Sequence, residues 1–339
     1  MSEVKTFNFH NSFVLESGSV LGNLTIAYHT FGHFDPGKNN VIWVFHALTA
    51  NSDVADWWPG LVGDDKAINP NEHFIVCANV LGSFYGSTGP RSIDPKNKKP
   101  FGLDFPQYTV RDVVSAQLLL AEHLNIYQIK MVIGGSFGGF QALEFALMFN
   151  GILDHLTLIA TSAKETAWSI AIHESQRLAL TADRSFFGNE PTSGQAGMKA
   201  ARGIGLLTYR TYEAYVETQT DNDQRIDGFM AASYIQYQGG KLVNRFHAHC
   251  YWFLTKCLDS HNLGRERGGL VKALESISIP TQVISIDTDR LVPPLEQKFM
   301  ADHIPNATYH TIHSDFGHDG FLIEGGQIAD IIKNNLKTY

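Results

Sequence analysis

The residues best suited to chemistry in this chain lie in the segment Gly134-Gly135-Ser136-Phe137-Gly138-Gly139. The segment has the pattern G-x-S-x-G and separates an apolar run at 129–133, typical of a buried strand, from a stretch at 140–146 with helical character. Such a strand–turn–helix connection needs small flanking residues and raises the serine hydroxyl above the sheet edge at a helix N-terminus. No Gly-Lys-Ser/Thr follows, which excludes a phosphate-binding loop. The alternative is a glycine-rich turn that only packs the helix on the strand; we favour Ser136 as a nucleophile.

A serine hydroxyl is a poor nucleophile unless a histidine removes its proton and a carboxylate orients that histidine. Where the serine sits on such a turn, the usual chain order is serine, acid, histidine. Asp289 follows an apolar run at 281–286, and functional groups of open α/β sheets lie beyond the carboxyl ends of strands. Asp287 is the competing carboxylate. The pattern D-x-x-V-P begins the next turn at Asp289, and we therefore favour Asp289.

The candidate base is His318, on a glycine-flanked loop between a short strand and the last helix, 29 residues after the favoured carboxylate. His310 and His313 fit this position less well because they fall within or beside the strand. A metal site built from these histidines, or from His247-Ala248-His249, lacks companion ligands at the usual spacing. We therefore predict a serine, acid and histidine site without a metal.

Acyl transfer also requires backbone N–H groups aimed at the oxygen on which negative charge develops, each worth roughly 3–4 kcal/mol. The amide of Phe137, next to the serine, is the first expected donor. The second should come from the loop after the strand at 40–45, where Leu48 is favoured and Ala47 or Thr49 are the alternatives. Together these parts predict acyl transfer through a serine ester, without naming the acceptor.

The elements that must position these residues follow from hydrophobic patterning. The first thirty residues alternate apolar and polar positions, as in antiparallel strands at a sheet edge. Runs at 40–45, 74–78 and 129–133 are almost continuously apolar, as in parallel strands covered on both faces. A helix is expected to begin at Thr109, which opens a capping box. The fold class is therefore α/β, with a mostly parallel central sheet flanked by helices.

The region 164–275 has helical patterning, many Tyr and Phe residues, and little that reads as a strand. The strands on either side of it must pair in one sheet for the strand–helix alternation to close. We therefore expect a core made of 1–163 and 276–339, with 164–275 inserted as a helical lid. A linker followed by an autonomous second domain is the alternative.

Composition limits the class of partner. With 26 basic and 34 acidic residues, a net charge of −8 and no long Lys/Arg block, the 339-residue chain lacks a nucleic-acid footprint. We find no apolar window of about 18 residues and no signal-peptide pattern, so neither membrane insertion nor secretion is expected. Cys77, Cys250 and Cys257 are too few and too scattered for a disulfide framework, which favours the cytoplasm. Small molecules are the expected partners.

From about residue 20 onward, the chain resembles the homoserine O-acetyltransferases of methionine biosynthesis, a family with the α/β-hydrolase fold. The resemblance includes lid motifs that general esterases of this fold lack. The core motifs include His46-Ala47-Leu48-Thr49, Asn79-Val80-Leu81-Gly82, Gly102-Leu103-Asp104-Phe105-Pro106 and Gly134-Gly135-Ser136. The lid motifs are Leu207-Thr208-Tyr209-Arg210, Tyr237-Gln238-Gly239 and Asn262-Leu263-Gly264-Arg265.

The resemblance implies that Ser136 takes an acetyl group from the co-substrate acetyl-CoA and passes it to the hydroxyl of L-homoserine. His318 would act as base and then acid, and Asp289 would orient it. The resemblance further implies that Arg210 pairs with the homoserine carboxylate and Asp319 with its ammonium group; a guanidinium suits a carboxylate in bidentate geometry. It also implies a homodimer formed through the lid helices, and no permanently bound cofactor.

The chain departs from the family pattern in one lid segment and one core loop. The family commonly has Arg-Phe-Asp-Ala-Asn-Ser-Tyr where this chain has His247, His249 and Cys250 at the third, fifth and sixth positions. Phe84 stands where a cysteine is frequent. If these residues line the acyl tunnel, the donor could be succinyl-CoA or the acceptor could differ from homoserine. A serine esterase with the same residues is the competing function, whereas a silent binding protein would need a broken triad, and none is evident.

Overall fold

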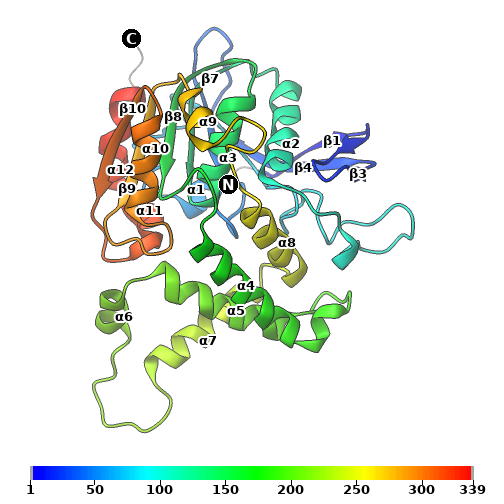
Figure 1. Ribbon diagram of the computed structural model, residues 1–339, viewed down its shortest axis with the longest axis vertical. Helices are drawn as coiled ribbons and strands as arrows, with labels where there is room; N and C mark the ends of the chain where they lie inside the picture. The colour runs from blue at the N-terminus through cyan, green and yellow to red at the C-terminus, as the bar shows by residue number, and fades with distance from the viewer. Residues whose placement is uncertain (1–2, 337–339) are drawn as a thin grey trace.

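Residues 3–336, which the computed structural model describes, fold around an eight-stranded sheet (Figure 1). The strands lie in the order β1-β4-β6-β5-β7-β8-β9-β10. Their bounds are β1 Lys5–Phe9, β4 Leu24–Phe31, β5 Val41–Phe45, β6 Phe74–Ala78, β7 Gln128–Gly135, β8 Ile152–Ile159, β9 Thr281–Ile286 and β10 Ala307–Ile312. A separate short hairpin joins β2 (Phe13–Val14) to β3 (Val20–Leu21).

The sheet is antiparallel at one edge and parallel elsewhere. β1 pairs antiparallel with β4, and β4 with β6, whereas the pairs from β6 through β5, β7, β8 and β9 to β10 are parallel. Every residue of β5, β6 and β9 is buried, which explains why these strands read as continuous apolar runs. The predicted α/β class, with a mostly parallel sheet and antiparallel strands in the first thirty residues, is confirmed.

Helices cover both faces of the sheet. Side chains along each strand alternate between the two faces, so the apolar strands present apolar side chains on both. Trp43 and Phe45 of β5 pack in one cluster with α2, α3 and α10, whereas Ile42 and Val44 pack in the other with α1 and α12. The predicted capping box at Thr109 begins α2, as expected. The bounds are α1 Val54–Trp57, α2 Val110–His123, α3 Phe137–Met148, α9 Leu270–Glu275, α10 Pro294–His303, α11 Gly320–Ile323 and α12 Gly325–Leu336, with 3-10 turns η1 Gly102–Asp104 and η3 Gly317–Asp319.

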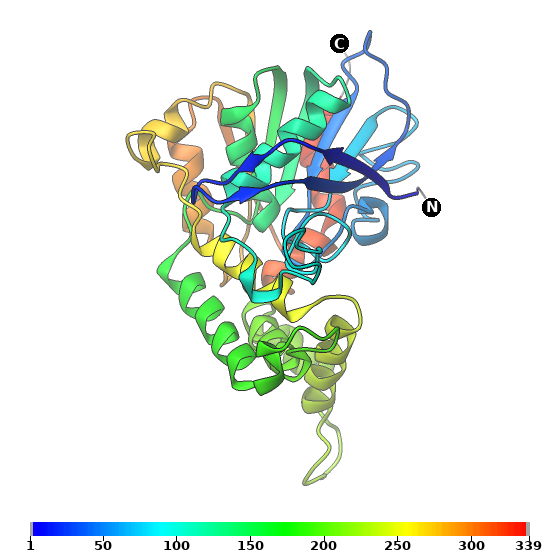
Figure 2. The same cartoon turned by 90° about the vertical axis from the view of Figure 1, so that its right-hand side faces the viewer.

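Between β8 and β9 the chain leaves the sheet and forms a group of helices beyond one end of it (Figures 1 and 2). β8 and β9 themselves pair in parallel, so the sheet closes across this excursion. The segment joining α6 to α7 projects furthest from the body (Figure 2). The helices are α4 Ala167–Ala182, α5 Gln195–Tyr209, α6 Tyr212–Gln219, α7 Met230–Val243 and α8 Ala248–Asp259, with the 3-10 turn η2 Arg184–Phe187.

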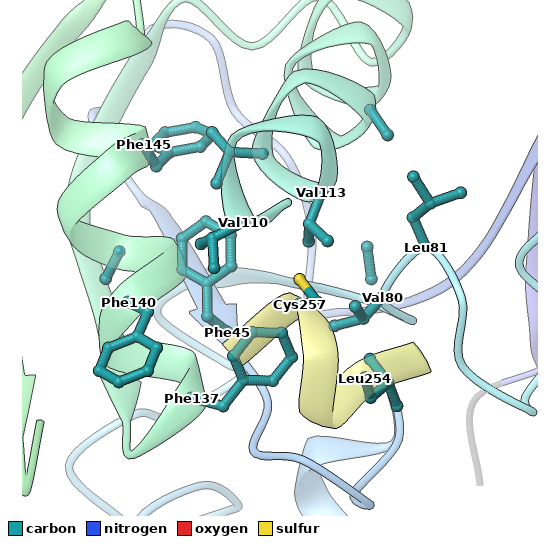
Figure 3. Packing of buried hydrophobic residues seen from close by; sticks show 14 of the residues in the cluster. Phe45, Val80, Leu81, Val110, Val113, Phe137, Phe140, Phe145, Leu254 and Cys257 are labelled. Carbon is teal, nitrogen blue, oxygen red and sulfur yellow. The ribbon is translucent and has the colours of Figure 1, made fainter. Parts of the chain in front are cut away.

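Helix α8 connects this group to the core. Figure 3 shows Leu254 and Cys257 of α8 among the side chains of Phe45, Val113 and Phe137, in one buried cluster. The contact removes apolar surface of both layers from water, which stabilises the position of α8 at about 25 cal/mol per Å² of buried area. Within residues 3–336, no helix combines the length and apolar character needed to cross a membrane.

Candidate active site

Ser136 occupies a strained turn between β7 and α3. Its backbone has φ 55° and ψ −125°, an unfavourable conformation for a residue with a side chain. A Cβ atom on Gly138 would lie 2.2 Å from the carbonyl oxygen of Phe45, and one on Gly134 would lie 2.2 Å from that of Gly138. These close approaches explain why glycines must flank the serine, and the turn directs its hydroxyl away from the sheet.

The side chains of Ser136, His318 and Asp289 form a continuous hydrogen-bonded chain. His318 Nε2 lies 2.8 Å from Ser136 Oγ, and His318 Nδ1 lies 2.6 Å from Asp289 Oδ2. Asp289 Oδ1 accepts hydrogen bonds from the amides of Leu291 and Val292, at 2.9 and 3.0 Å. The three residues follow β7, β10 and β9, whose carboxyl ends meet at one edge of the sheet. The arrangement can move a proton from the serine hydroxyl to the imidazole.

The charge of Asp289 tunes His318. Burial of the imidazole, the largest single effect, would lower its pKa, but the charge and hydrogen bond of Asp289 and the charges of Asp319 and Glu165 together outweigh burial. The net effect raises the pKa of His318 above its ordinary value of 6.5. A base of this strength suits a proton transfer near neutral pH.

The competing residues lie elsewhere. Asp287 is hydrogen-bonded to the exposed His313, with 2.7 Å between His313 Nδ1 and the carboxylate. The ring of His310 contacts the hydroxyl of Thr308, two residues away on the same strand. The structure thus brings together the favoured residues and not their alternatives.

Ser136 and His318 open on a cavity of about 440 Å³ between the sheet and the helices that follow β8. Leu48, from the loop between β5 and α1, lies in its wall, whereas the side chain of Phe137 points into the core (Figure 3). The inserted segment contributes further lining residues: His173, Arg202, Tyr209, Lys241, Arg245, Tyr251 and Leu258. Ser136 and His318 therefore face a space whose walls come from both layers.

The inserted helices also hold the loops that carry Asp289 and His318. Trp168 Nε1 donates a hydrogen bond of 2.9 Å to the carbonyl of Arg290, and Ser169 Oγ donates one of 3.4 Å to that of Leu291. Thr211 Oγ1 donates to the carbonyl of Asp315, in the loop before His318. The starts of α4 and α6 are thus hydrogen-bonded to the loops that carry Asp289 and His318.

Sequence reasoning missed a second histidine in the cavity wall. His173 is buried, its Nδ1 lies 2.7 Å from Asp259 Oδ1, and Arg177 Nη2 lies 2.6 Å from Asp259 Oδ2. His173 and Arg177 are four residues apart on α4, a spacing that puts them on one helix face. Asp259 lies 86 residues after His173 in the chain, and no local sequence pattern predicts the contact between them.

Comparison with known proteins agrees with this geometry. A family model described as alpha/beta hydrolase fold matches residues 40–324. A homoserine O-acetyltransferase of Cyclobacterium marinum is 43% identical over 320 residues, 94% of this chain and 91% of the relative. One of Chlorobaculum parvum is 43% identical over 328 residues, 96% of this chain and 92% of the relative. This chain belongs to the homoserine O-acetyltransferase family.

Solved structures show the same fold over the whole chain. A homoserine O-acetyltransferase from Bacillus anthracis superposes with a TM-score of 0.90 at 22% identity, covering 100% of this chain and 99% of the other. Esterase E22 superposes equally well, with a TM-score of 0.90 at 23% identity and coverage of 99% and 100%. At these identities the superpositions establish the α/β-hydrolase fold and leave the choice of reaction to the residues of the site.

Two residues that the family resemblance singles out, Arg210 and Asp319, contact each other. Arg210 Nε lies 3.2 Å from Asp319 Oδ2, and the guanidinium lies 5.4 Å from the ring centre of Tyr234. Asp319 lines the cavity beside His318. The two side chains are about three-quarters or more buried, so each partly neutralises the other in a site of limited water access.

The departures from the homoserine O-acetyltransferase pattern are packing residues of α8. His247 Nδ1 accepts from the amide of His249 and thereby caps the helix, while His249 Nε2 lies 2.7 Å from the carbonyl of Phe186. Cys250 is fully buried. Burial lowers the pKa of His247 to about 4, so its ring is neutral near pH 7.

Phe84, the other departure, is 41% exposed, and its ring lies near those of Phe246 and His247. From the same stretch of chain, Arg245 and Tyr251 line the cavity instead. Among the described residues that line the cavity containing Ser136, none is one of these departures.

Proposed function

We propose that this chain is a CoA-dependent O-acyltransferase that moves an acetyl group from acetyl-CoA to the hydroxyl of L-homoserine. The observation that carries the proposal is the hydrogen-bonded series Ser136, His318 and Asp289 at a cavity wall, in a chain 43% identical to named homoserine O-acetyltransferases. Transfer proceeds in two steps through an acetyl ester of Ser136.

In the first step, Ser136 Oγ attacks the thioester carbonyl carbon while His318 Nε2 takes the hydroxyl proton. Charge develops on the carbonyl oxygen, where the amides of Phe137 and Leu48 donate hydrogen bonds. The intermediate then expels the CoA thiolate, which receives the proton from His318. Asp289 holds the imidazole with Nδ1–H toward its carboxylate throughout and stabilises the imidazolium form.

In the second step, the homoserine hydroxyl gives its proton to His318 Nε2 and attacks the acetyl ester. The ester bond to Ser136 breaks, and the serine oxygen recovers the proton from His318. The products are O-acetylhomoserine and free enzyme, so the proton balance closes without a further reactant.

The acceptor is an amino acid with one charge of each sign, and the Arg210–Asp319 pair supplies the complement of each. On binding, the substrate carboxylate pairs with the guanidinium of Arg210, and the substrate ammonium pairs with the carboxylate of Asp319. One ion pair within the protein is exchanged for two with the substrate, so neither buried charge is left alone. This exchange favours a zwitterion over a simple alcohol.

The insertion acts as a lid in this scheme, with 1–163 and 276–339 as the core and 164–275 as the lid. Its residues complete the cavity wall, and a closed cavity favours an alcohol acceptor over water. Exposed apolar side chains support the expected homodimer; they include Tyr212 on α6, Phe229 immediately before α7 and Tyr237 on α7. Light scattering on the purified chain tests that assembly.

The function is tested by release of free thiol from acetyl-CoA, with and without L-homoserine. We expect rapid homoserine-dependent release, far slower release with succinyl-CoA, and at least about a 10⁴-fold loss in Ser136→Ala with the fold retained. A rate of thiol release that does not depend on homoserine, together with rapid hydrolysis of an aryl acetate, would instead identify a serine esterase.

The role of Arg210 has its own test. Arg210→Ala should raise the KM for homoserine and leave the single-turnover acetylation of Ser136 unchanged, because its partner is the acceptor. Arg225→Ala, which removes an arginine from an exposed ion pair in the segment between α6 and α7, is the control. An equal loss in both half-reactions of Arg210→Ala contradicts the assignment.

A further inference from the structure

Cationic side chains of the lid line the cavity that contains Ser136. Arg202 lies on α5, Lys241 in the last turn of α7, and Arg245 in the segment between α7 and α8. Across residues 3–336, none of the three takes part in an ion pair within 4 Å, although most arginines of the lid do. Within the described part of the chain, these three charges therefore have no carboxylate in direct contact.

Tight packing of α5 against α7 brings residues of both helices to one cavity. A Cβ atom on Gly203 would lie 3.1 Å from Ile235, and one on Gly239 would lie 3.1 Å from the Cα atom of Lys199. Each glycine is a near neighbour of one of the cations, Gly203 of Arg202 and Gly239 of Lys241. The absence of side chains at these contacts permits the close approach that places both cations at the cavity.

Two of the cations are also held in place. Arg245 Nη1 donates to the carbonyl oxygen of Thr49 and to the hydroxyl of Tyr85, which fixes the guanidinium against the loop that contains Leu48. The guanidinium of Arg202 lies 5.7 Å from the ring centre of Tyr209. Such contacts reduce the conformational entropy that a side chain loses when it binds a ligand.

The remaining charges of the wall do not cancel this positive set. Among the described lining residues the carboxylates are Asp56 and Asp319, and Asp319 is already paired with Arg210. The described cavity wall thus has more cationic than anionic side chains, in a chain whose net charge is −8. A positive cleft in an acidic protein concentrates anions locally and not over the whole surface.

We infer that Arg202, Lys241 and Arg245 form the phosphate-binding site for the nucleotide end of the acyl-CoA donor, an inference that rests on the proposed function. The donor carries a diphosphate and a ribose phosphate, a multiply charged anion that matches several unpaired cations. The acceptor carries one carboxylate, for which Arg210 suffices. Exposed Lys241 and Arg245 with half-buried Arg202 mark the path along which the thioester reaches Ser136.

The experiment compares two thioesters, acetyl-CoA and acetyl-pantetheine, which has the same reacting group but no phosphates. Lys241→Gln should raise the KM for acetyl-CoA about 5-fold, equivalent to ~1 kcal/mol, and Arg202→Gln combined with Lys241→Gln should raise it further. The KM for acetyl-pantetheine should not change. Raising the ionic strength should weaken acetyl-CoA use by the wild type more than by the double variant.

The matched control is Lys256→Gln, which removes the same charge from lid helix α8, where Lys256 lies 5.4 Å from the ring centre of Trp252 and outside the cavity wall. Suppose the wild type uses acetyl-CoA. If the variants then raise the KM equally for both thioesters, or raise the KM for acetyl-CoA no more than the control does, the phosphate site is overturned. A wild type that releases no thiol from either donor overturns the proposed function itself.

Discussion

Asparagine in place of Asp289 should disable the imidazole without disturbing the turn that carries it. The side-chain oxygen can still accept from the amides of Leu291 and Val292, which lie 2.9 and 3.0 Å from Oδ1. The amide nitrogen then faces His318 Nδ1, a donor opposite a donor. To relieve that clash, the imidazole must carry its proton on Nε2, where it cannot accept the hydroxyl proton of Ser136.

The expected loss is large for activity and small for stability. In a serine protease triad the same exchange lowers kcat by about 10⁴, which corresponds to about 5 kcal/mol at 1.36 kcal/mol per decade. The two backbone hydrogen bonds survive, so Tm should change by no more than a few degrees. Without the charge of Asp289, burial dominates and the pKa of His318 falls, so the acid limb of the rate profile should move to lower pH.

Stopped-flow acetylation of Ser136 by acetyl-CoA, measured as a function of pH, tests both expectations. Asp287→Asn is the matched control, because the carboxylate of Asp287 contacts the exposed ring of His313 and the amide of Ser314 and has no hydrogen bond to Ser136 or His318. The proposed role of Asp289 is refuted if Asp289→Asn keeps activity within tenfold of the wild type, if the acid limb of its rate profile stays in place, or if the Asp287→Asn control loses as much activity.

Other substitutions address the fold. Gly138→Ala should lower the free energy of unfolding by about 3 kcal/mol or more in urea titrations, because the new Cβ would lie 2.2 Å from a carbonyl oxygen of β5; Gly240→Ala, with open space around it on α7, should instead stabilise by about 0.5–1 kcal/mol. His249→Asn should cost about 1 kcal/mol in the same titration through loss of the bond to Phe186, with an unchanged ratio of acetyl-CoA to succinyl-CoA use; a changed ratio would return this residue to the substrate path. Burial lowers the pKa of His46 to about 4 and that of His261 to about 3. Below pH 6.5 these two imidazoles bind more protons in the unfolded chain than in the folded one. Their contribution to the free energy of unfolding should therefore be complete above that pH and fall as the pH drops toward 4, as unfolding followed by circular dichroism at graded pH would show. A free energy of unfolding that rises on acidification would contradict this.

The sequence predicted what depends on local order along the chain. Ser136 was identifiable because its glycines and flanking elements are contiguous, and the strands because their burial on both faces leaves continuous apolar runs. Asp289 and His318 followed from chain order and from the rule that parallel strands place functional groups at their carboxyl ends. Contiguity and topology are therefore enough to predict the centre of the candidate site.

What the sequence could not predict depends on contacts between distant helices. His173 meets Asp259 across 86 residues, and Arg210 meets Asp319 across 109. The convergence of α5 and α7 on the cavity depends on a packing distance set by two glycines. His247 suggested a substrate contact only because its type was unusual, whereas in the structure it caps a helix. Substitutions in a pattern do not reveal which way a side chain points.

Three hydrogen bonds limit how parts of such enzymes can be exchanged. Trp168 and Ser169 donate to the carbonyls of residues 290 and 291, and Thr211 donates to a carbonyl in the loop before His318. A lid exchanged between relatives as a module would carry away the supports of the acid and histidine loops while leaving the serine turn untouched. Chimeras cut at 164 and 275 should thus lose rate as well as change substrate. Moving 287–292 and 314–319 together with the lid would keep the grafted helices and their anchoring loops matched.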